Sequence, residues 1–270
     1  MTIRILSLNA WGGKLHELLM PYLKAADADV FCLQEVVRTT DAPSEWLTYR
    51  DSDRVLPQRA NMFDELRALL PGHDGFFCPT ARGELFDENE RRVLSEFGLA
   101  TFVRTSLPVI GQALDFVYGE FSPGGWGARP RARNAHVVRI FDYEKSAPLT
   151  VAHMHGLHDP AGKGDTQARV KQADAFVEII RSVWRPGERL VVCGDFNVLP
   201  GSVTFDALAA LGLYDLVTAR GFTDTRTSHY AKPQRFADYM LVTPDVEVKR
   251  FDVVAEPEVA DHRALLLEIG

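Results

Sequence analysis

The run Leu190-Val191-Val192-Cys193-Gly194-Asp195-Phe196-Asn197 is the most informative stretch of this chain. Its apolar half predicts a buried strand that stops at a glycine, and its polar half follows at once. Because side chains alternate along a strand, the spacing puts Asp195 and Asn197 on one face and Phe196 on the other. An acid and an amide at a strand end serve either as a turn device or as part of a functional site. This run alone supports both readings equally.

The rest of the chain alternates short apolar runs with helical patterns. Runs rich in Val, Ile, Leu and Phe predict strands over residues 3–9, 30–34, 98–104, 134–142, 149–155, 190–194, 236–242, 246–254 and 263–269. Apolar residues spaced three and four apart predict helices over residues 14–25, 61–70, 167–183 and 203–211. Pro and Gly clusters separate these elements, and we find neither an internal repeat nor a long linker. We therefore expect one α/β (α+β) domain over residues 1–270, built from mixed β-sheets.

The composition is that of a globular protein, because 46% of the 270 residues are hydrophobic and 25% are charged. No apolar run approaches the roughly 18 residues of a membrane span, and the first residues lack the pattern of a signal peptide. Cys32, Cys78 and Cys193 stand singly, which indicates neither a disulfide framework nor a zinc knuckle. We expect a cytoplasmic protein without stable membrane insertion.

The net charge of −7 argues against a protein that binds long nucleic acid, since such proteins normally present a basic face. One basic segment stands out against this background. Between Trp126 and Arg139 the chain has four arginines and no acid, namely Arg129, Arg131, Arg133 and Arg139. The segment is either a solvated loop that leads into a strand or a phosphate-facing loop beside an active site.

Residues of the kinds that catalyse reactions recur at the ends of the expected strands. Each has an ordinary alternative, because a strand-end acid or amide often caps a turn and a lone histidine is often structural. Their joint arrangement is harder to explain in that way. The set comprises Asn9, Glu35, His153 with His155, Asp195 with Asn197, and Asp261 with His262.

The chemistry of this set points to phosphoryl transfer to water. Carboxylate and amide oxygens without cysteine suit a hard divalent cation such as Mg²⁺ or Mn²⁺. A histidine beside such a cation can donate to a developing phosphoryl charge or act as an acid or base. A further carboxylate can orient the attacking water.

In order and spacing, these motifs resemble the endonuclease/exonuclease/phosphatase (DNase I-like) superfamily. The resemblance spans nearly the whole chain, and the ordered set is far more specific than any one motif. It implies a sandwich of two mixed β-sheets packed face to face with flanking helices. The matching pieces are Leu8-Asn9, Leu33-Gln34-Glu35, His153-Met154-His155, Gly194-Asp195-Phe196-Asn197, Phe236-Ala237-Asp238-Tyr239 and Asp261-His262.

The resemblance also implies roles for individual residues. Glu35 matches the principal metal-binding glutamate, and Asn9 and Asp261 match its supporting ligands. Asp195 matches the aspartate that positions or deprotonates the water, with Asn197 as the amide beside it. For the remaining roles, His262 and His155 match histidines that contact the scissile phosphate, and Asp238 matches the carboxylate that orients His262.

Two positions depart from the common pattern of the superfamily. Many members have Asn-Thr-His or Asn-Ser-His where this chain has His153-Met154-His155, so His153 replaces an amide. We assign His153 to substrate binding, together with Arg133 and Asn134 of the basic segment. Abasic-site nucleases of the superfamily often place an acid two residues after the first asparagine, where this chain has Trp11, which disfavours a repair nuclease.

We expect a metal-dependent phosphodiesterase or phosphatase whose partner is a small or lipid-like phosphate ester. The alternative is a DNase I-like endonuclease or exonuclease acting on nucleic acid, which the acidic balance of the chain disfavours. A zinc hydrolase of the metallo-β-lactamase type would use His153, His155 and His158, but Leu157 stands where that motif requires an aspartate. A catalytically inactive binding module is disfavoured because the metal and histidine set is complete.

Overall fold

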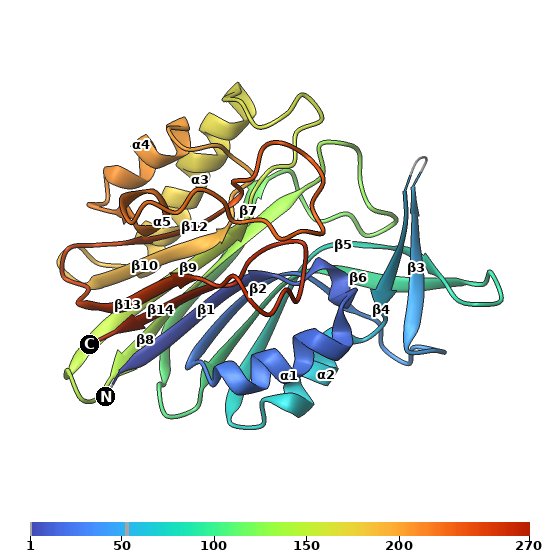
Figure 1. The fold of residues 1–270 in the computed structure, drawn as a ribbon, viewed down its shortest axis with the longest axis horizontal. Coiled ribbons are helices and arrows are strands. Elements are labelled where there is room, and N and C mark those ends of the chain that lie inside the picture. The colour runs from blue at the N-terminus through green and yellow to red at the C-terminus, as the bar shows by residue number, and fades with distance from the viewer. Residues whose placement is uncertain (1, 52–53) are drawn as a thin grey trace.

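The computed structural model describes residues 2–51 and 54–270, and its strands form two sheets (Figure 1). The first sheet has the order β13-β14-β1-β2-β6-β5-β3-β4. Its strands β1 and β2 are parallel and its other neighbours are antiparallel, so the sheet is mixed. Its strands are β1 (Ile3–Asn9), β2 (Val30–Arg38), β3 (Trp46–Asp51), β4 (Arg54–Arg59), β5 (His73–Phe86), β6 (Arg92–Arg104), β13 (Val248–Val253) and β14 (Leu265–Ile269).

The second sheet is also mixed and has the order β11-β12-β10-β9-β8-β7. Here β9 and β10 are parallel, and the other neighbours are antiparallel. The predicted pair of mixed sheets is therefore confirmed. The strands are β7 (Val109–Tyr118), β8 (Arg133–Asp142), β9 (Ala147–His155), β10 (Arg189–Asp195), β11 (Tyr214–Asp215) and β12 (Asp238–Val242).

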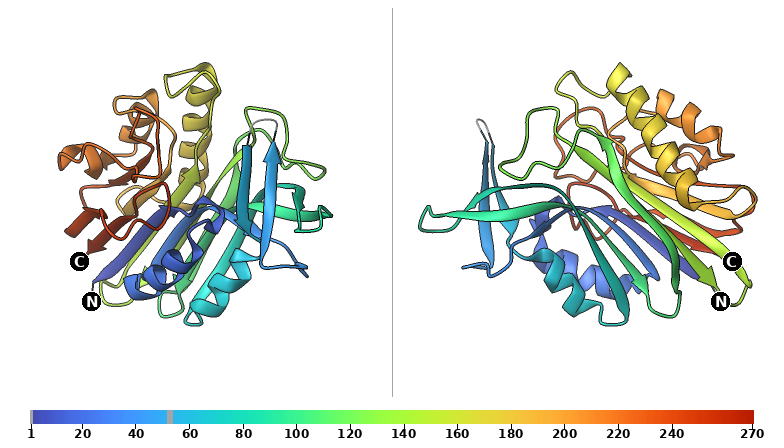
Figure 2. Two further views of the ribbon diagram at one scale, coloured as in Figure 1. Left: turned by 45° about the vertical axis from the view of Figure 1, so that its right-hand side comes forward. Right: turned by 180° about the vertical axis from the view of Figure 1, so that it is seen from behind.

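Helices lie on the outer faces of the two sheets (Figure 2). On the first sheet these are α1 (His16–Ala26) and α2 (Met62–Leu69), and on the second α3 (Gln167–Val183), α4 (Val203–Ala209) and α5 (Leu216–Ala219). A short 3-10 turn, η1 (Trp11–Gly13), follows β1. Within residues 2–51 and 54–270, no helix combines the length and apolar character that a membrane span requires.

The alternation of side chains along β1 shows how the core is divided. Ile3 and Ile5 point into the core shared by the two sheets, whereas Leu6 and Leu8 pack in a separate core beneath α1 and α2. Both faces of the strand are therefore apolar, as expected for a strand that is covered on both sides. The polar Asn9 comes only at the end of this strand, on the face between the sheets.

All nine expected strands and four expected helices exist, but several strands escaped the sequence analysis. The β3–β4 hairpin and β7 are largely half-buried or exposed, so their sequences lack a continuous apolar run. Strand β5 carries Gly75, Pro79 and Gly83, residues that normally mark turns, and its register shifts after Pro79. Strand β5, the longest of the strands that were not predicted, is thus irregular at the residues that suggested a turn in the sequence.

Gly194 explains why the strand carrying the opening motif lies so close to its neighbour. Its φ of 129° belongs to a region that residues with a side chain rarely adopt, and a Cβ there would lie 2.2 Å from the carbonyl oxygen of Met154. Glycine therefore lets β10 approach β9 at this point. The register that follows pairs Asp195 with His155 and brings the ends of both strands together.

Candidate active site

The candidate site lies where strands of both sheets end side by side. Parallel β1 and β2 deliver polar groups from the first sheet, and parallel β9 and β10 deliver them from the second. Strand β12 and the segment before β14 complete the set. The converging residues are Asn9, Glu35, His155, Asp195, Asp238, Asp261 and His262.

Asp195 stands at the centre and uses its two oxygens differently. Its Oδ1 accepts a hydrogen bond from the backbone N–H of Asn197 at 3.0 Å, which makes an Asx turn. Its Oδ2 accepts a hydrogen bond from Nδ2 of Asn9 at 3.0 Å and so joins the second sheet to the first. The motif is therefore a turn device and a site residue at once. Asn197 takes the left-handed conformation, with φ 54°, and lines the same cavity.

Glu35 reaches the site because it occupies a β-bulge. Leu33 pairs with Ala100 and Val36 with Gly98, so β2 has one residue more than β6 across this interval. Glu35 itself has φ 56°, a conformation uncommon for residues other than glycine. Simple alternation would turn Glu35 away from the second sheet, and the bulge instead sets its carboxylate 3.9 Å from Nε2 of His155.

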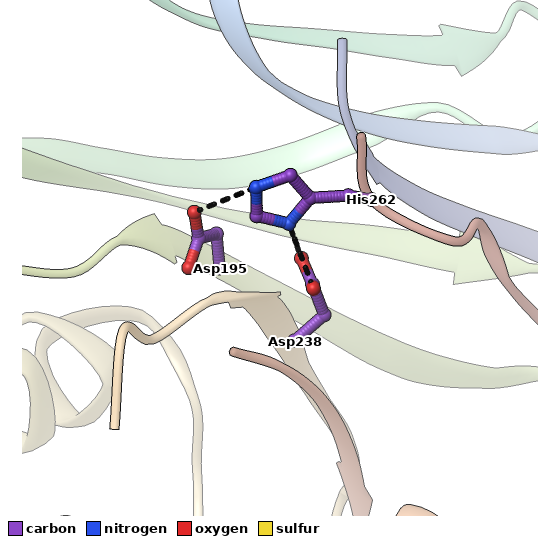
Figure 3. A group of neighbouring side chains, drawn as sticks. All are labelled: Asp195, Asp238 and His262. Atoms are coloured by element: carbon purple, nitrogen blue, oxygen red, sulfur yellow. Dashed lines mark hydrogen bonds and ion pairs between the residues drawn. The ribbon is translucent and has the colours of Figure 1, made fainter. Parts of the chain in front are cut away.

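His262 is held between two carboxylates (Figure 3). Its Nδ1 lies 2.8 Å from Oδ2 of Asp238, and its Nε2 lies 3.6 Å from Oδ2 of Asp195. Arg226 donates a hydrogen bond to Nε2, so the ring carries its proton on Nδ1 and donates it to Asp238. Burial, followed by the charge of Arg226, lowers the pKa of His262 to about 4. The ring is therefore neutral at pH 7 in this arrangement.

Burial changes the ionisation of several other groups in the site. Burial, and next the charge of Asp261, raises the pKa of Glu35 to about 7. Burial raises the pKa of Asp238 to about 7 as well. His155 shifts in the opposite direction, because burial and then Arg133 hold its pKa well below the usual value. The centre thus combines crowded acids with neutral histidines.

The crowded acids suit a cation. The Oδ1 atom of Asp261 is buried and has no hydrogen-bond partner within the described part of the chain, so an oxygen lone pair is left for a ligand. Neighbouring Glu35 has the raised pKa that a nearby positive charge would relieve. Glu35 and Asp261, both oxygen donors, therefore fit a hard divalent cation.

A second acidic group is less suited to hold an ion. Among the described residues, ligand atoms of Asp195, Asp238 and His262 lie within 4.8 Å of one another. Both oxygens of Asp238, however, lie within hydrogen-bond distance of Nδ1 of His262, and the ring stands between the two carboxylates (Figure 3). We therefore interpret this group as an acid–histidine pair that faces Asp195.

A cavity of about 570 Å³ opens onto the site. Asn9 and Asp238 do not line it; each supports a lining residue through a hydrogen bond, to Asp195 and His262 respectively. Asn9 also accepts a hydrogen bond from the backbone N–H of Trp11 through its own Oδ1. The other predicted residues that line the cavity are Glu35, Arg133, His155, Asp195, Asn197, Asp261 and His262.

The structure does not bring His153 and Asn134 to this cavity, although the sequence analysis assigned both to substrate binding. His153 is buried between the sheets, where Nε2 lies 2.8 Å from Oγ1 of Thr101 and Nδ1 lies 3.3 Å from Nε2 of Gln34. Asn134 is fully buried and donates a hydrogen bond to the carbonyl oxygen of Cys78. Both side chains satisfy polar groups inside the sandwich.

Two cations of the site escaped the sequence analysis. Arg226 donates to His262 and also lies 3.1 Å from Oδ2 of Asp261, and Lys163 lines the cavity while donating to the carbonyl oxygen of Phe236. Both come from irregular segments without a strand pattern. The sequence around Arg226 and Lys163 contains no motif that predicts a role in the site, because these loops reach the strand ends only in the folded chain.

Comparison with known proteins places the whole chain in one group. Residues 6–262 match the family model described as "Endonuclease/Exonuclease/phosphatase family". No curated protein matches the chain. The match includes every residue that the structure gathers at the strand ends.

Solved structures share the fold at low sequence identity. An endonuclease/exonuclease/phosphatase from Bacteroides vulgatus is 20% identical, with a TM-score of 0.69, and the alignment covers 100% of this chain and 99% of that one. A mannosyl-6-phosphatase from Bacteroides thetaiotaomicron is 16% identical, with a TM-score of 0.66 and 99% of both chains covered. D. rerio TDP2 complexed with a single-strand DNA product is 14% identical, with a TM-score of 0.64 and coverage of 100% and 99%.

The crowding of acids predicts that Glu35→Gln stabilises the protein in the presence of a chelator. The pKa of Glu35 in the folded protein, about 7, exceeds its usual value of 4.5, so stability falls as pH rises between these values. A neutral glutamine avoids this loss. We expect the Tm at pH 8 to rise by about 3 °C and the Tm at pH 5 to change little.

Differential scanning calorimetry of both proteins in EDTA measures this difference. Glu178→Gln, which alters an exposed acid on α3, is the matched control and should leave the Tm unchanged at both pH values. A lower Tm for Glu35→Gln at pH 8 would contradict the account of the crowded site.

Proposed function

The chain belongs to the endonuclease/exonuclease/phosphatase family, and we propose that it uses Mg²⁺, or Mn²⁺ in its place, to hydrolyse a small or lipid-like phosphate ester. Members of this family are metal-dependent phosphoesterases. The observation that carries the proposal is the position of Asp195, whose Oδ2 lies 3.6 Å from Nε2 of both His155 and His262. A carboxylate between two histidines can hold a water beside the phosphorus of a phosphate whose oxygens the histidines contact.

In the proposed reaction, Asp195 orients the water and accepts its proton while the oxygen attacks phosphorus. The bond from phosphorus to the ester oxygen breaks, and the leaving alkoxide takes up a proton from solvent to become the alcohol, while Asp195 later returns its proton to solvent. Arg226 faces the phosphoryl oxygens and stabilises their developing charge, and His262 adds to this once its Nε2 is protonated. Asp238 acts through His262, since it fixes the tautomer and favours the charged ring when a phosphate approaches Nε2.

Glu35 and Asp261 are the residues that would hold the cation, with Asn9 as a supporting ligand beside them. When bound there, a divalent cation supplies charge neutralisation to the phosphoryl oxygens. Arg133 adds a fixed positive charge to the same cavity and is held in place by a hydrogen bond to the carbonyl oxygen of Gly156.

The distribution of charge favours a small substrate over nucleic acid. The chain carries a net charge of −7, and the cations of the site line one cavity, where Arg133, Lys163, Arg226 and Lys232 are joined toward the β3–β4 hairpin by Arg54, Arg129 and Arg131. A long polyanion would instead need cations spread along a face. The structural similarity to a mannosyl-6-phosphatase supports the same choice, whereas the similarity to TDP2 bound to DNA supports the nuclease alternative.

Two wider assignments follow the same proposal. We treat residues 1–270 as one catalytic domain, because Glu35 comes from one sheet and Asp195 from the other. We place the protein in the cytoplasm, since Cys32, Cys78 and Cys193 are all buried and free.

The proposal predicts complete dependence on a divalent cation. Hydrolysis of bis-p-nitrophenyl phosphate and of a panel of phosphosugars should vanish in EDTA and return with Mg²⁺ or Mn²⁺. Full activity in chelator would contradict the proposal. Plasmid DNA belongs in the same panel, and its preferred cleavage would favour the nuclease alternative.

A double-mutant cycle tests whether Asp238 acts through His262. We expect His262→Ala to lower kcat about 10³-fold and Asp238→Asn to lower it about 10²-fold. Because the two side chains act as one unit, the double variant should be no slower than His262→Ala alone. Steady-state kinetics give the cycle, and Asp174→Asn, at an exposed position on α3, is the matched control. If the losses in kcat of the two single variants add up in the double variant, Asp238 and His262 act independently and the prediction is wrong.

A further inference from the structure

The cavity that contains the catalytic residues has a second set of lining residues, which is apolar and which the proposed reaction does not use. We call this set the apolar wall. Five of its six residues lie on the first sheet at the side of the β3–β4 hairpin, which stands apart from the rest of the sheet (Figures 1 and 2), and the sixth lies in the loop between β7 and β8. The apolar wall consists of Val37, Tyr49, Leu56, Leu85, Phe97 and Trp126.

The apolar wall follows the order of the strands. Val37 lies on β2 two residues beyond Glu35, and the next strands in the sheet, β6, β5, β3 and β4, contribute one residue each. Val37 pairs with Phe97, and Tyr49 pairs with Leu56. In the part of the chain that the structure describes, the hairpin joins the sheet at one residue pair, between Thr48 of β3 and Phe86 of β5. The wall thus extends from the strand of the proposed metal-binding glutamate to the hairpin, with Val37 and Leu85 buried at its base and the other four residues partly exposed.

Trp126 is fixed in place before any ligand arrives. Its ring lies against Gly83, where a Cβ would come within 2.4 Å of the indole. Its Nε1 donates a hydrogen bond to the carbonyl oxygen of Glu84 at 3.1 Å. The rings of Tyr49 and Phe97 make edge contacts with it, at centroid distances of 5.8 and 6.4 Å. A rigid aromatic surface loses little side-chain entropy on binding.

Two arginines tie the loop that carries Trp126 to the hairpin. Arg129 and Arg131 both form ion pairs with Asp51, and Arg131 donates a hydrogen bond to the hydroxyl of Tyr49 at 2.6 Å. Their charges are therefore engaged at the edge of the wall. The basic segment of the sequence thus divides, because Arg133 serves the catalytic end and Arg139 pairs with Glu188 elsewhere.

The apolar wall leaves aromatic and aliphatic surface open to the cavity. Tyr49, Leu56, Phe97 and Trp126 are only partly buried, and three of them, Tyr49, Phe97 and Trp126, pack against a small core around Val37 and Leu85. Partly exposed apolar side chains with convergent polar groups at one end characterise ligand cavities. An apolar group would cover this aliphatic and aromatic surface, and Arg54, Arg129 and Arg131 line the cavity beside it.

We propose that the substrate is a phosphate ester whose organic group is an elongated apolar body, alkyl or aryl, that lies on the apolar wall while the phosphate meets Asp195 and His262. The inference rests on the proposed phosphoesterase function and adds the class of substrate. The wall binds the apolar body equally before and during the reaction, so it acts through KM.

The test compares Leu56→Ala with Val55→Ala. Leu56 lines the cavity, whereas Val55 is the next residue on β4, is 69% exposed and does not line it. The substrates are octyl phosphate, 1-naphthyl phosphate and glycerol phosphate, each with Mg²⁺. The wild-type protein should prefer at least one of the two apolar esters to glycerol phosphate by about tenfold or more in kcat/KM.

Leu56→Ala should raise KM for the preferred ester about tenfold, leave kcat within about twofold and hardly change glycerol phosphate hydrolysis. Val55→Ala should match the wild type. Binding of octylphosphonate and benzylphosphonate, measured by calorimetry, gives a second readout without turnover and should weaken in Leu56→Ala alone.

The outcomes separate the two proposals. If neither these three esters nor bis-p-nitrophenyl phosphate is hydrolysed with any divalent cation, the phosphoesterase function fails. If all three esters are hydrolysed equally well and Leu56→Ala behaves as Val55→Ala does, the function stands and the apolar class of substrate is wrong. Preference for plasmid DNA over all three esters would also overturn it. A preference for the octyl or the naphthyl ester supports the inference and identifies the body as alkyl or aryl.

Discussion

The hydrogen bond from Asn9 to Asp195 is the interaction on which the site depends. It joins the end of a strand in one sheet to the end of a strand in the other, at 3.0 Å and out of contact with solvent. A buried carboxylate without partners would be costly, and this bond, together with the Asx turn to Asn197, satisfies it. The same bond turns Oδ2 of Asp195 toward both histidines. The hydrogen bond from Asn9 to Asp195 therefore both joins the two sheets and orients the central carboxylate of the site.

Unusual backbone conformations at a few residues put the remaining groups in place. The bulge at Glu35 and the close approach at Gly194 both depend on a positive φ. Because of these conformations, the buried strands β2 and β10 place polar side chains in the site as well as apolar side chains in the core. The raised pKa of Glu35 has the same origin, because burial and neighbouring acids act on a carboxylate that the bulge holds in place. Strain and charge crowding at such positions are typical of functional sites.

The sequence predicted the elements with strong periodicity and the site residues at their ends. Helix α3 was predicted with its observed bounds, because its apolar spacing is regular. The β3–β4 hairpin was missed, since half-exposed strands carry no continuous apolar pattern. Arg226 was missed because an irregular loop has no period to interpret.

His153 illustrates a different limit of sequence reasoning. It shares a face of β9 with His155, so alternation alone treats the two residues alike. Two residues along a strand correspond to about 6.7 Å, and this step takes His153 from the cavity into the interior, beside Thr101. How deep a residue lies between two sheets depends on how the sheets pack, and the spacing of residues along the chain does not predict this.

The most direct test of the central arrangement is a crystal structure with Mn²⁺, in which anomalous scattering locates the ion. The account predicts a peak about 2.1 Å from the carboxylate of Glu35, with Asp261 beside it and the hydrogen bond from Asn9 to Asp195 retained. An ion bound instead by Asp195, Asp238 and His262, with the acid–histidine pair broken, would contradict it.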